Sequence, residues 1–215
     1  FLSSATGLVT YNDFNLAIND LYRLVRTEFY TRNEILPFDY IYSTDLLFDG
    51  QPGQGTNWRH TNLIPSFAPT SNIPADHWTA LYALVARSNT VITRTPTANL
   101  TDAQKALLLA KAKFFRALGY RTLAYLFGGV PLNLEEVTSP RTDYVTATRA
   151  EVYEQCIIDL KDAVAGLPAI NQVLDGEINA EAAGHLLAEV YLAAGQFQNA
   201  VDAATTVIGN ANVSL

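Results

Sequence analysis

The segment from Thr101 to Phe127 places the strongest constraint on the fold. Thr101 is followed three residues later by Gln104, which is a capping-box signature, and Gly128-Gly129 is a typical helix stop. At 100° per residue, apolar side chains fall on every side of the predicted helix. They are Leu108, Leu109, Phe114, Phe115, Leu118, Leu123 and Leu126. A helix that is apolar all round must be packed by neighbours on several sides, so we expect it at the centre of the fold.

Further helices are predicted from apolar side chains that recur every three or four residues and from capping signals. They cover residues 12–30, 74–94, 148–166, 179–194 and 197–208. No convincing strand alternation is longer than a few residues. The predicted fold class is therefore all-α, built from antiparallel helix pairs.

Two long stretches interrupt this pattern, at about 43–73 and 130–147. The first is rich in glycine, proline, asparagine, serine and threonine, and neither keeps an apolar period. Connections of this length are uncommon in compact domains and usually functional. We interpret residues 1–215 as a single helical domain in which these stretches are irregular loop insertions.

The charge balance excludes several classes of partner. The chain has Lys+Arg 14 against Asp+Glu 21, a formal net charge of −7, so nucleic acid and anionic membrane surfaces are poor partners. No apolar run approaches the roughly 18–20 residues of a membrane-spanning helix. The single cysteine, Cys156, lies on an apolar helix face and is interpreted as a core residue.

The residues that could carry catalysis or bind metal form no recognised motif. His185 lies between Glu181 and Glu189 on one helix stripe, which could hold a metal but is more simply an exposed charged stripe. Asp45 and Asp49 could be an acid/base pair or calcium ligands, or simply solvated loop charges. We expect no catalytic residue, no metal site and no cofactor.

Arg116 is predicted to have a structural role. It lies at the same helical angle as Leu109 and Leu123 on the all-apolar helix, so its stem is expected to be buried. A buried guanidinium must be paired. We expect its partner to be Glu154 or Asp159 on the following helix, with an anion site as the alternative.

The first long loop carries the best ligand signal. A neutral sugar offers an apolar C–H face and a ring of hydroxyls, so its site needs an aromatic platform beside amides, carboxylates or arginine. Asn57-Trp58-Arg59 supplies that set in three consecutive residues, and Asp45 adds a carboxylate. The alternative is that Trp58 folds back and pins the loop onto the helices. Trp78, by contrast, occupies a helix-packing position.

The segment from Ala183 to Ala200 resembles a tetratricopeptide repeat. Tyr191 would pack between the two helices and Gly195 would permit the turn. Phe197 would staple the start of the second helix, and the small Ala200 would let the helices approach. Because a helix pair cannot bury its apolar face alone, further pairs are expected, and the helices that begin after Thr101 and Thr148 would form one.

The order of motifs along the chain resembles the N-terminal part of the SusD/RagB family of nutrient-binding outer-membrane lipoproteins. The matching residues are Trp78-Thr-Ala-Leu-Tyr82, Arg87-Ser-Asn89-Thr-Val-Ile92, Ala112-Lys-Phe-Phe-Arg116-Ala117 with Tyr120, Phe127-Gly128-Gly129-Val130-Pro131-Leu132, Arg149 to Tyr153 with Asp159-Leu160, and Gly176 through Ala182-Ala183, Leu187, Tyr191-Leu192 and Gly195. The chain departs from the family at Gly176-Glu177, where Gly-Arg is usual. Family members are also longer, and their C-terminal half is absent here.

The resemblance implies a tetratricopeptide-like helical scaffold and no enzymatic activity. It also implies binding of a glycan or other nutrient at the cell surface and partnership with a SusC-like, TonB-dependent outer-membrane transporter. The protein would be held at the outer membrane by a lipid anchor that lies outside this chain. The alternative hypothesis is a helical-repeat module that binds a partner protein and no small molecule. A third hypothesis is that the protein is an enzyme, and hydrolysis of an oligosaccharide by the pure protein would support it.

Overall fold

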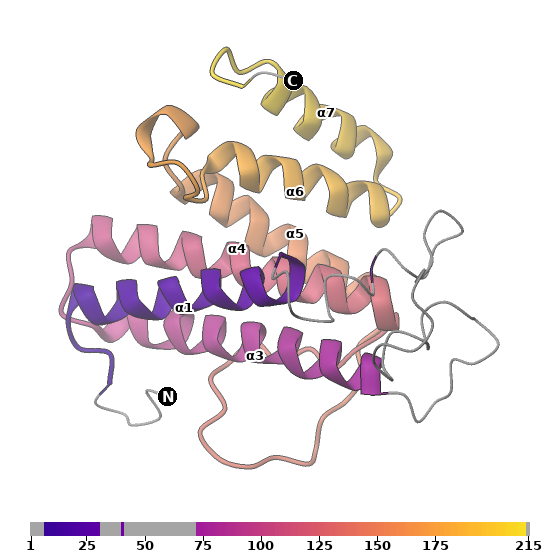
Figure 1. Ribbon diagram of the computed structural model, residues 1–215. Coiled ribbons are helices and arrows are strands. Elements are labelled where there is room, and N and C mark those ends of the chain that lie inside the picture. Colours follow the sequence, from indigo (N-terminus) through magenta and orange to yellow (C-terminus); the bar gives the residue numbers. More distant parts are fainter. Residues whose placement is uncertain (1–6, 31–39, 41–71, 214–215) are drawn as a thin grey trace, which may run out of the picture. The chain divides into compact units, whose positions relative to one another are not determined.

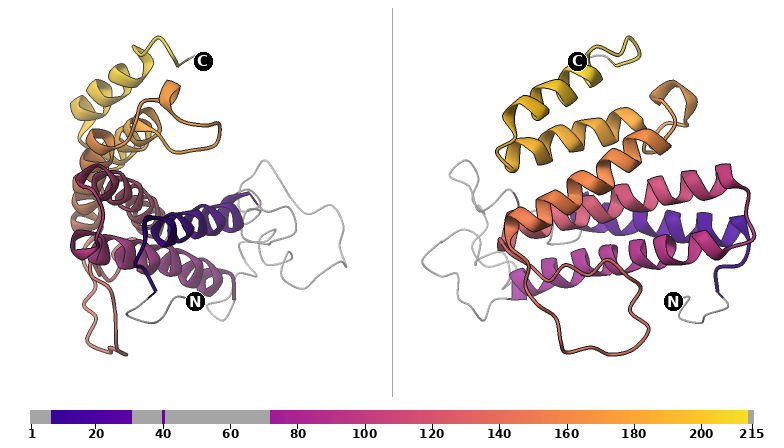
Figure 2. Two further views of the ribbon diagram at one scale, coloured as in Figure 1. Left: turned by 90° about the vertical axis from the view of Figure 1, so that its left-hand side faces the viewer. Right: turned by 180° about the vertical axis from the view of Figure 1, so that it is seen from behind.

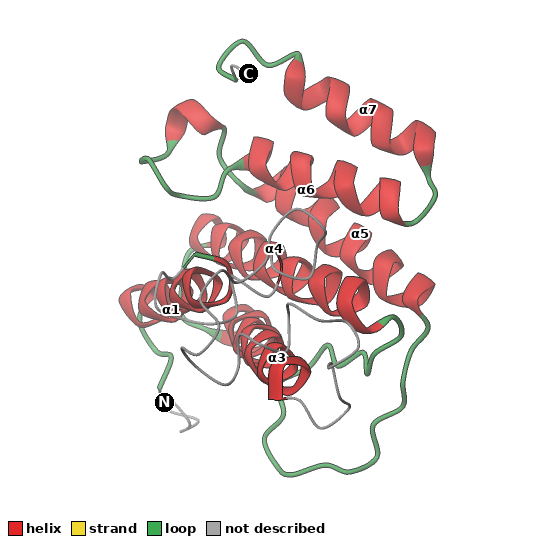
Figure 3. Cartoon of the chain, turned by 45° about the vertical axis from the view of Figure 1, so that its right-hand side comes forward, coloured by secondary structure: helices red, strands yellow, loops and turns green. Residues whose placement is uncertain are grey.

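The computed structural model describes residues 7–30, 40 and 72–213, and this part of the chain is helical (Figure 1). The helices are α1 (Tyr11–Phe29), α3 (Asn72–Arg94), α4 (Asp102–Phe127), α5 (Arg149–Gly166), α6 (Ala180–Ala193) and α7 (Phe197–Ile208), with short 3-10 turns at Thr95–Thr97 and Ile170–Gln172. Figure 3 draws no strand in the described residues. Pro131 and Thr146 form an isolated antiparallel bridge. The all-α prediction is confirmed.

The predicted helix starts are confirmed by their caps. The Thr101 side chain accepts a hydrogen bond from the Gln104 backbone at 3.3 Å, and the Gln104 side chain accepts one from the Thr101 backbone at 3.0 Å. Thr148 and Glu151 form the same reciprocal pair at the start of α5. Asn179 caps α6 by accepting a hydrogen bond from the Ala182 backbone at 2.8 Å. These contacts satisfy amide groups that a helix start otherwise leaves unpaired.

The described residues divide into two compact units. One comprises those within 1–21 and 84–215, and the other comprises those within 22–83. Helices α1 and α3 each contribute turns to both. The expected single domain over 1–215 stays a prediction, as does the loop at about 43–73, which lies almost entirely outside the described residues.

In the first unit, α4 to α7 follow one another as successive antiparallel helices (Figures 1 and 2). Phe115, Tyr120 and Leu123 of α4 are each at most 1% exposed, and Phe114 is also buried. Neighbouring helices contribute the rest of the core. Its other fully enclosed large side chains include Phe14, Ile18, Leu21, Leu84, Val85, Val91, Leu108 and Leu160. The prediction that the all-apolar helix is central is confirmed for this unit.

Helices α4 and α5 form a closely packed pair. A Cβ added at Gly166 would lie 2.8 Å from the Cβ of Ala110, so the two helices approach at a point where only a hydrogen fits. The Sγ atom of Cys156 lies 3.5 Å from the Ala117 carbonyl, and burial raises the pKa of the thiol. Cys156 is therefore the core residue that its helix position predicted.

The second pair, α6 and α7, confirms part of the predicted repeat. Gly195 has a φ of +74° in the turn, a backbone conformation that residues other than glycine rarely adopt. Tyr191 and Ala200 are both buried, at 7% and 8% exposure, and Lys161 of α5 lies 6.0 Å from the centroid of the Tyr191 ring. The predicted role of Phe197 is wrong, because its side chain is 65% exposed. The stripe of α7 that faces α6 contains the small Ala200 and Val207, and Phe197 lies on the adjacent stripe.

In the second unit, the described parts are the end of α1, Tyr40 and the beginning of α3. Leu81 is its most enclosed apolar side chain, at 1% exposure. Trp78 does not occupy the buried position expected of it. It is 37% exposed, and its ring lies 4.8 Å from that of Tyr82, one turn further along α3. None of the described helices has the length and apolar character needed to cross a membrane.

Candidate functional site

The residues predicted to bind ligand fall within segments whose placement is not described. Asp45, Asn57, Trp58 and Arg59, together with Asp49, all lie between residues 41 and 71. Their role as a ligand site therefore stays a prediction. The structure does describe the helix ends on either side of this segment and Tyr40, the residue immediately before it.

A buried polar cluster joins those three places in the second unit. The Oε1 atom of Glu28, in the last turn of α1, accepts a hydrogen bond from the Tyr40 hydroxyl at 2.6 Å. The same oxygen lies 2.7 Å from Nδ1 of His77 in α3. Glu28 and His77 are 2% and 4% exposed. The Tyr40 ring also stacks on Phe29, with centroids 5.5 Å apart, and meets the His77 ring edge-on.

This cluster gives the ligand-predicted segment fixed points of attachment. A buried carboxylate is costly unless donors surround it, and here Tyr40 and His77 supply two. The Oε2 atom of Glu28 is buried without a hydrogen-bond partner in the described part of the chain. We interpret the cluster as a structural anchor at the ends of the segment.

The second predicted loop, at 130–147, is described and belongs to the first unit. Two glycines connect it to the end of α4: Gly128, whose φ is +80°, and Gly129. A Cβ at Gly129 would lie 2.5 Å from the Ala147 carbonyl oxygen, so a side chain cannot be placed there without moving backbone. The two ends of the loop meet here, because the Ala147 amide donates to the Val130 carbonyl at 3.0 Å.

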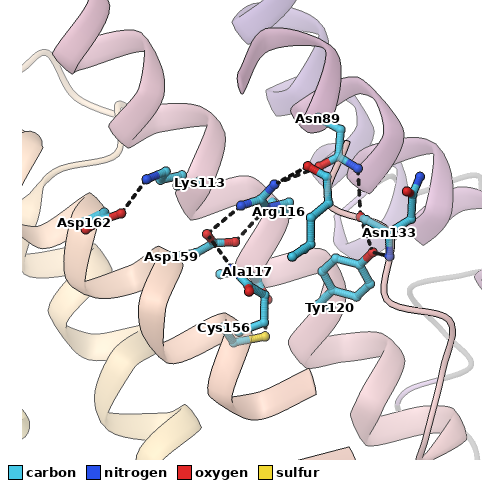
Figure 4. Close-up of polar contacts among 11 residues, drawn as sticks. Asn89, Lys113, Arg116, Ala117, Tyr120, Asn133, Cys156, Asp159 and Asp162 are labelled. Atoms are coloured by element: carbon cyan, nitrogen blue, oxygen red, sulfur yellow. Dashed lines mark hydrogen bonds and ion pairs between the residues drawn. The ribbon is translucent and has the colours of Figure 1, made fainter. Parts of the chain in front are cut away.

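Arg116 holds the first part of this loop from inside the core (Figure 4). Its Nε and Nη2 atoms donate to the two carboxylate oxygens of Asp159 on α5, both at 2.7 Å. Its Nη1 atom donates to the Asn89 side chain of α3 and to the Leu134 carbonyl, both at 3.0 Å. The predicted burial of Arg116 is confirmed, and Asp159 is its partner. The other expected partner, Glu154, accepts a hydrogen bond from Gln196.

Asn133 is the point at which the loop is fixed most closely. Its carbonyl accepts hydrogen bonds from the Asn89 side chain at 2.9 Å and from the Tyr120 hydroxyl at 2.6 Å. Its amide lies 2.6 Å from the same hydroxyl, which can accept from it. Burial raises the pKa of Tyr120, so this hydroxyl stays protonated and keeps its hydrogen bond to the loop.

Glu136 provides the last attachment before the loop leaves the helices. Arg94 of α3 donates from Nε at 2.8 Å and from Nη2 at 2.6 Å, a bidentate geometry. The hydrogen bond to Glu136 raises the pKa of Arg94 further. The Glu136 amide donates to the Thr93 hydroxyl at 3.2 Å. Asn89, Arg94, Arg116 and Tyr120 thus form a polar clamp on residues 133–136.

Beyond the clamp the loop projects from the helices as an open arm (Figure 2). Every residue from Val137 to Thr146 is exposed, including Val145 at 82%. Arg141 donates to both oxygens of Asp143, at 3.0 and 3.1 Å, and its guanidinium lies 5.4 Å from the centroid of Tyr144. The arm is thus held at its root and exposed along the rest of its length.

Among the described residues, no group of three potential metal ligands is found. His185 is exposed and pairs with Glu189 at 3.3 Å, as the charged-stripe interpretation expects. Glu181, one turn earlier on the same stripe, has other partners. It accepts hydrogen bonds from the Ile170 amide and from the Asn210 side chain, because the chain folds back over the start of α6.

Sequence reasoning found Arg116 but not the rest of the clamp. Asn89 and Tyr120 lie in the motifs that carry the family resemblance, yet nothing in their spacing shows that both bind Asn133. A polar side chain on an apolar helix face is the one signal that marks them. Their common target becomes visible only when α3 and α4 are placed beside the loop.

Taken together, the described helices form antiparallel, tetratricopeptide-like hairpins, and the loop at 130–147 is clamped onto them at its root. The family described as "Starch-binding associating with outer membrane" matches residues 29–192, which is most of the chain. The chain therefore belongs to the SusD-like family.

Individual relatives agree with this assignment. The chain is 29% identical over 205 residues to SusD-like protein P2 of Formosa agariphila, covering 94% of this chain and 40% of that protein. It superposes on a SusD superfamily protein of Bacteroides thetaiotaomicron with a TM-score of 0.74 at 26% identity, covering 94% of this chain and 46% of the other.

A laminarin-binding SusD-like protein shares the fold, with a TM-score of 0.81 at 24% identity; the superposition covers 94% of this chain and 44% of that one. The chain thus spans less than half the length of each of these relatives.

Proposed function

We propose that this chain is the helical part of a non-catalytic surface protein that binds a glycan. The observation that carries the proposal is the family match, which runs from the end of α1 to the end of α6. It therefore includes the whole segment that contains Asp45, Asn57, Trp58 and Arg59. The Glu28–Tyr40–His77 cluster supports it, since it fixes the flanks of that segment. Asn57, Trp58 and Arg59 would form the sugar platform and Asp45 would add a hydroxyl acceptor.

The proposal includes a place of action and a partner. The family is described as associating with the outer membrane. We propose that the protein is held at the cell surface by a lipid anchor outside this chain and acts beside a SusC-like, TonB-dependent transporter. Co-purification of such a barrel with the tagged protein is the expected result, and purification without any barrel from cells that express one would contradict it.

Glycan binding is tested with a microarray of neutral oligosaccharides that includes laminarin fragments, followed by calorimetric titration of the best-binding sugar. We expect Trp58→Ala to weaken binding by at least about tenfold, the scale of losing a central aromatic contact. Trp78→Phe, at the chain's other tryptophan, is the matched control and should bind normally. Unchanged binding by Trp58→Ala, with native circular dichroism, would remove Trp58 from the site.

A protein-binding module without a small-molecule ligand is the second candidate. It is favoured by the exposed apolar side chains of α7, where Phe197, Val201 and Ile208 are 57–65% exposed. Such a surface is typical of a contact with another polypeptide. Silence on the glycan array together with co-purification of a transporter would select this function over glycan binding. Hydrolysis of any array sugar would contradict both proposals, since neither includes catalysis.

A further inference from the structure

A group of aromatic, cationic and anionic side chains lies where α4 and α6 come together. Tyr125, near the end of α4, is 67% exposed. The guanidinium of Arg121, one turn earlier, lies 5.9 Å from the centroid of the Tyr125 ring. Arg121 Nη2 donates to Glu189 Oε2 of α6 at 2.8 Å, and His185 Nε2 lies 3.3 Å from Glu189 Oε1. We name these four residues the Tyr125 cluster.

Stability of the fold does not account for this arrangement. Helix α4 buries most of its large side chains, yet it turns a tyrosine outward at its end. The Arg121–Glu189 pair is 32% and 40% exposed, and ion pairs at such exposure stabilise a fold only slightly. The ion pair with Glu189 of α6 instead holds the Arg121 guanidinium beside the Tyr125 ring. A site built on helices holds its geometry better than one built on a loop.

The chemistry of the cluster selects a neutral, hydroxyl-rich ligand. The charges of Arg121 and Glu189 cancel, so neither an anion nor a cation is favoured. The Tyr125 hydroxyl and the Nε and Nη1 groups of Arg121 have no hydrogen-bond partner among the described residues, which leaves donors for sugar hydroxyls. The exposed ring offers an apolar surface for the C–H face of a pyranose.

We propose that the Tyr125 cluster is a second glycan contact, separate in sequence from Asn57-Trp58-Arg59. This inference rests on the proposed glycan-binding function and assigns it a further surface. The Arg141–Asp143–Tyr144 group on the exposed arm has similar residue types, but all three lie within four residues of one loop and no second element fixes them. Tyr144 is therefore the matched control for Tyr125.

The test is calorimetric titration of the best-binding array sugar into the wild-type chain and three variants. We expect Tyr125→Ala to weaken binding by roughly three- to tenfold, the scale of one aromatic contact. Arg121→Lys, which keeps the charge but loses the planar fork, should also weaken it. Tyr144→Ala should bind as the wild type does. Circular dichroism and melting temperature check that each variant folds.

The outcomes separate this inference from the proposed function. Wild-type binding that Tyr125→Ala leaves unchanged would overturn the Tyr125 cluster as a glycan contact and leave the proposed function standing. If Tyr125→Ala leaves glycan binding unchanged but a protein that co-purifies with the wild type is lost, the cluster binds a protein partner and the inference is overturned. Equal losses in Tyr125→Ala and Tyr144→Ala would also overturn it. A wild-type chain that binds no sugar would overturn the function and this inference with it.

Discussion

Arg116 and Asp159 form a bidentate ion pair across α4 and α5, with both nitrogen–oxygen distances at 2.7 Å and the Asp159 side chain fully enclosed. The guanidinium also reaches Asn89 and the Leu134 carbonyl. One buried side chain therefore connects two other helices and the root of the exposed loop. Because each of the three guanidinium nitrogens donates to an acceptor, the pair can be kept in the core.

Removal of Arg116 from this ion pair should destabilise the fold strongly. Arg116→Met keeps much of the apolar stem but leaves Asp159 as a buried, uncompensated carboxylate. We expect the free energy of unfolding to fall by about 3–5 kcal/mol. Urea denaturation followed by circular dichroism measures it. Lys113→Met, which breaks the exposed pair with Asp162 on the same two helices, is the control and should cost less than about 1 kcal/mol.

The Arg94–Glu136 contact should control the exposed arm without controlling the core. Arg94→Gln removes the bidentate contact, and the arm beyond it should open more often. We expect trypsin to cleave after Arg141 at least about threefold faster, because local opening governs proteolysis of a folded protein. Mass spectrometry of timed digests identifies the cut. Lys113→Gln is the control, because it breaks the Lys113–Asp162 ion pair between α4 and α5 and leaves the Arg94–Glu136 contact intact. If Arg94→Gln is cleaved no faster than this control, Arg94 does not restrain the arm.

The loop root should not tolerate a side chain at Gly129. Alanine there would place its Cβ 2.5 Å from the Ala147 carbonyl, so Gly129→Ala should cost at least about 2 kcal/mol and shift the backbone. Gly176 provides the comparison. Its φ is +87° but nothing lies within 4 Å of an added Cβ, so Gly176→Ala carries only conformational strain of about 1 kcal/mol. Denaturation midpoints that rank the two variants in the opposite order would contradict the close approach.

The cap of α5 should make stability depend on pH. Hydrogen bonds from the Thr148 backbone amide, at 2.7 Å, and from its hydroxyl lower the pKa of Glu151. The contribution is therefore fully present above the unfolded pKa of glutamate, about 4.3, and is lost as pH falls through the lower folded value. The melting temperature of Glu151→Gln should fall less on acidification than that of the wild type. Thr148→Ser keeps both donors and should follow the wild-type curve.

Local signals were sufficient for the helices and for the class of fold. Apolar periodicity and the capping residues at Thr101, Thr148 and Asn179 act over a few residues, so they can be read along the chain, and the observed helices begin and end within two residues of the predicted bounds. The turn at Gly195 is equally local. The ordered motifs also pointed correctly to the SusD-like family, which a match over residues 29–192 shows.

Contacts between helices depend on how the helices are rotated and shifted against one another, and periodicity does not encode this. The burial of Arg116 followed from its own helix, but the choice of Asp159 over Glu154 depended on the register of α4 against α5. Phe197 was predicted to staple the start of the second helix from the resemblance to a tetratricopeptide repeat, yet the packed stripe of α7 is the one with Ala200. The shared target of Asn89 and Tyr120 likewise arises only from assembly, since their partner Asn133 lies on a loop that neither helix specifies.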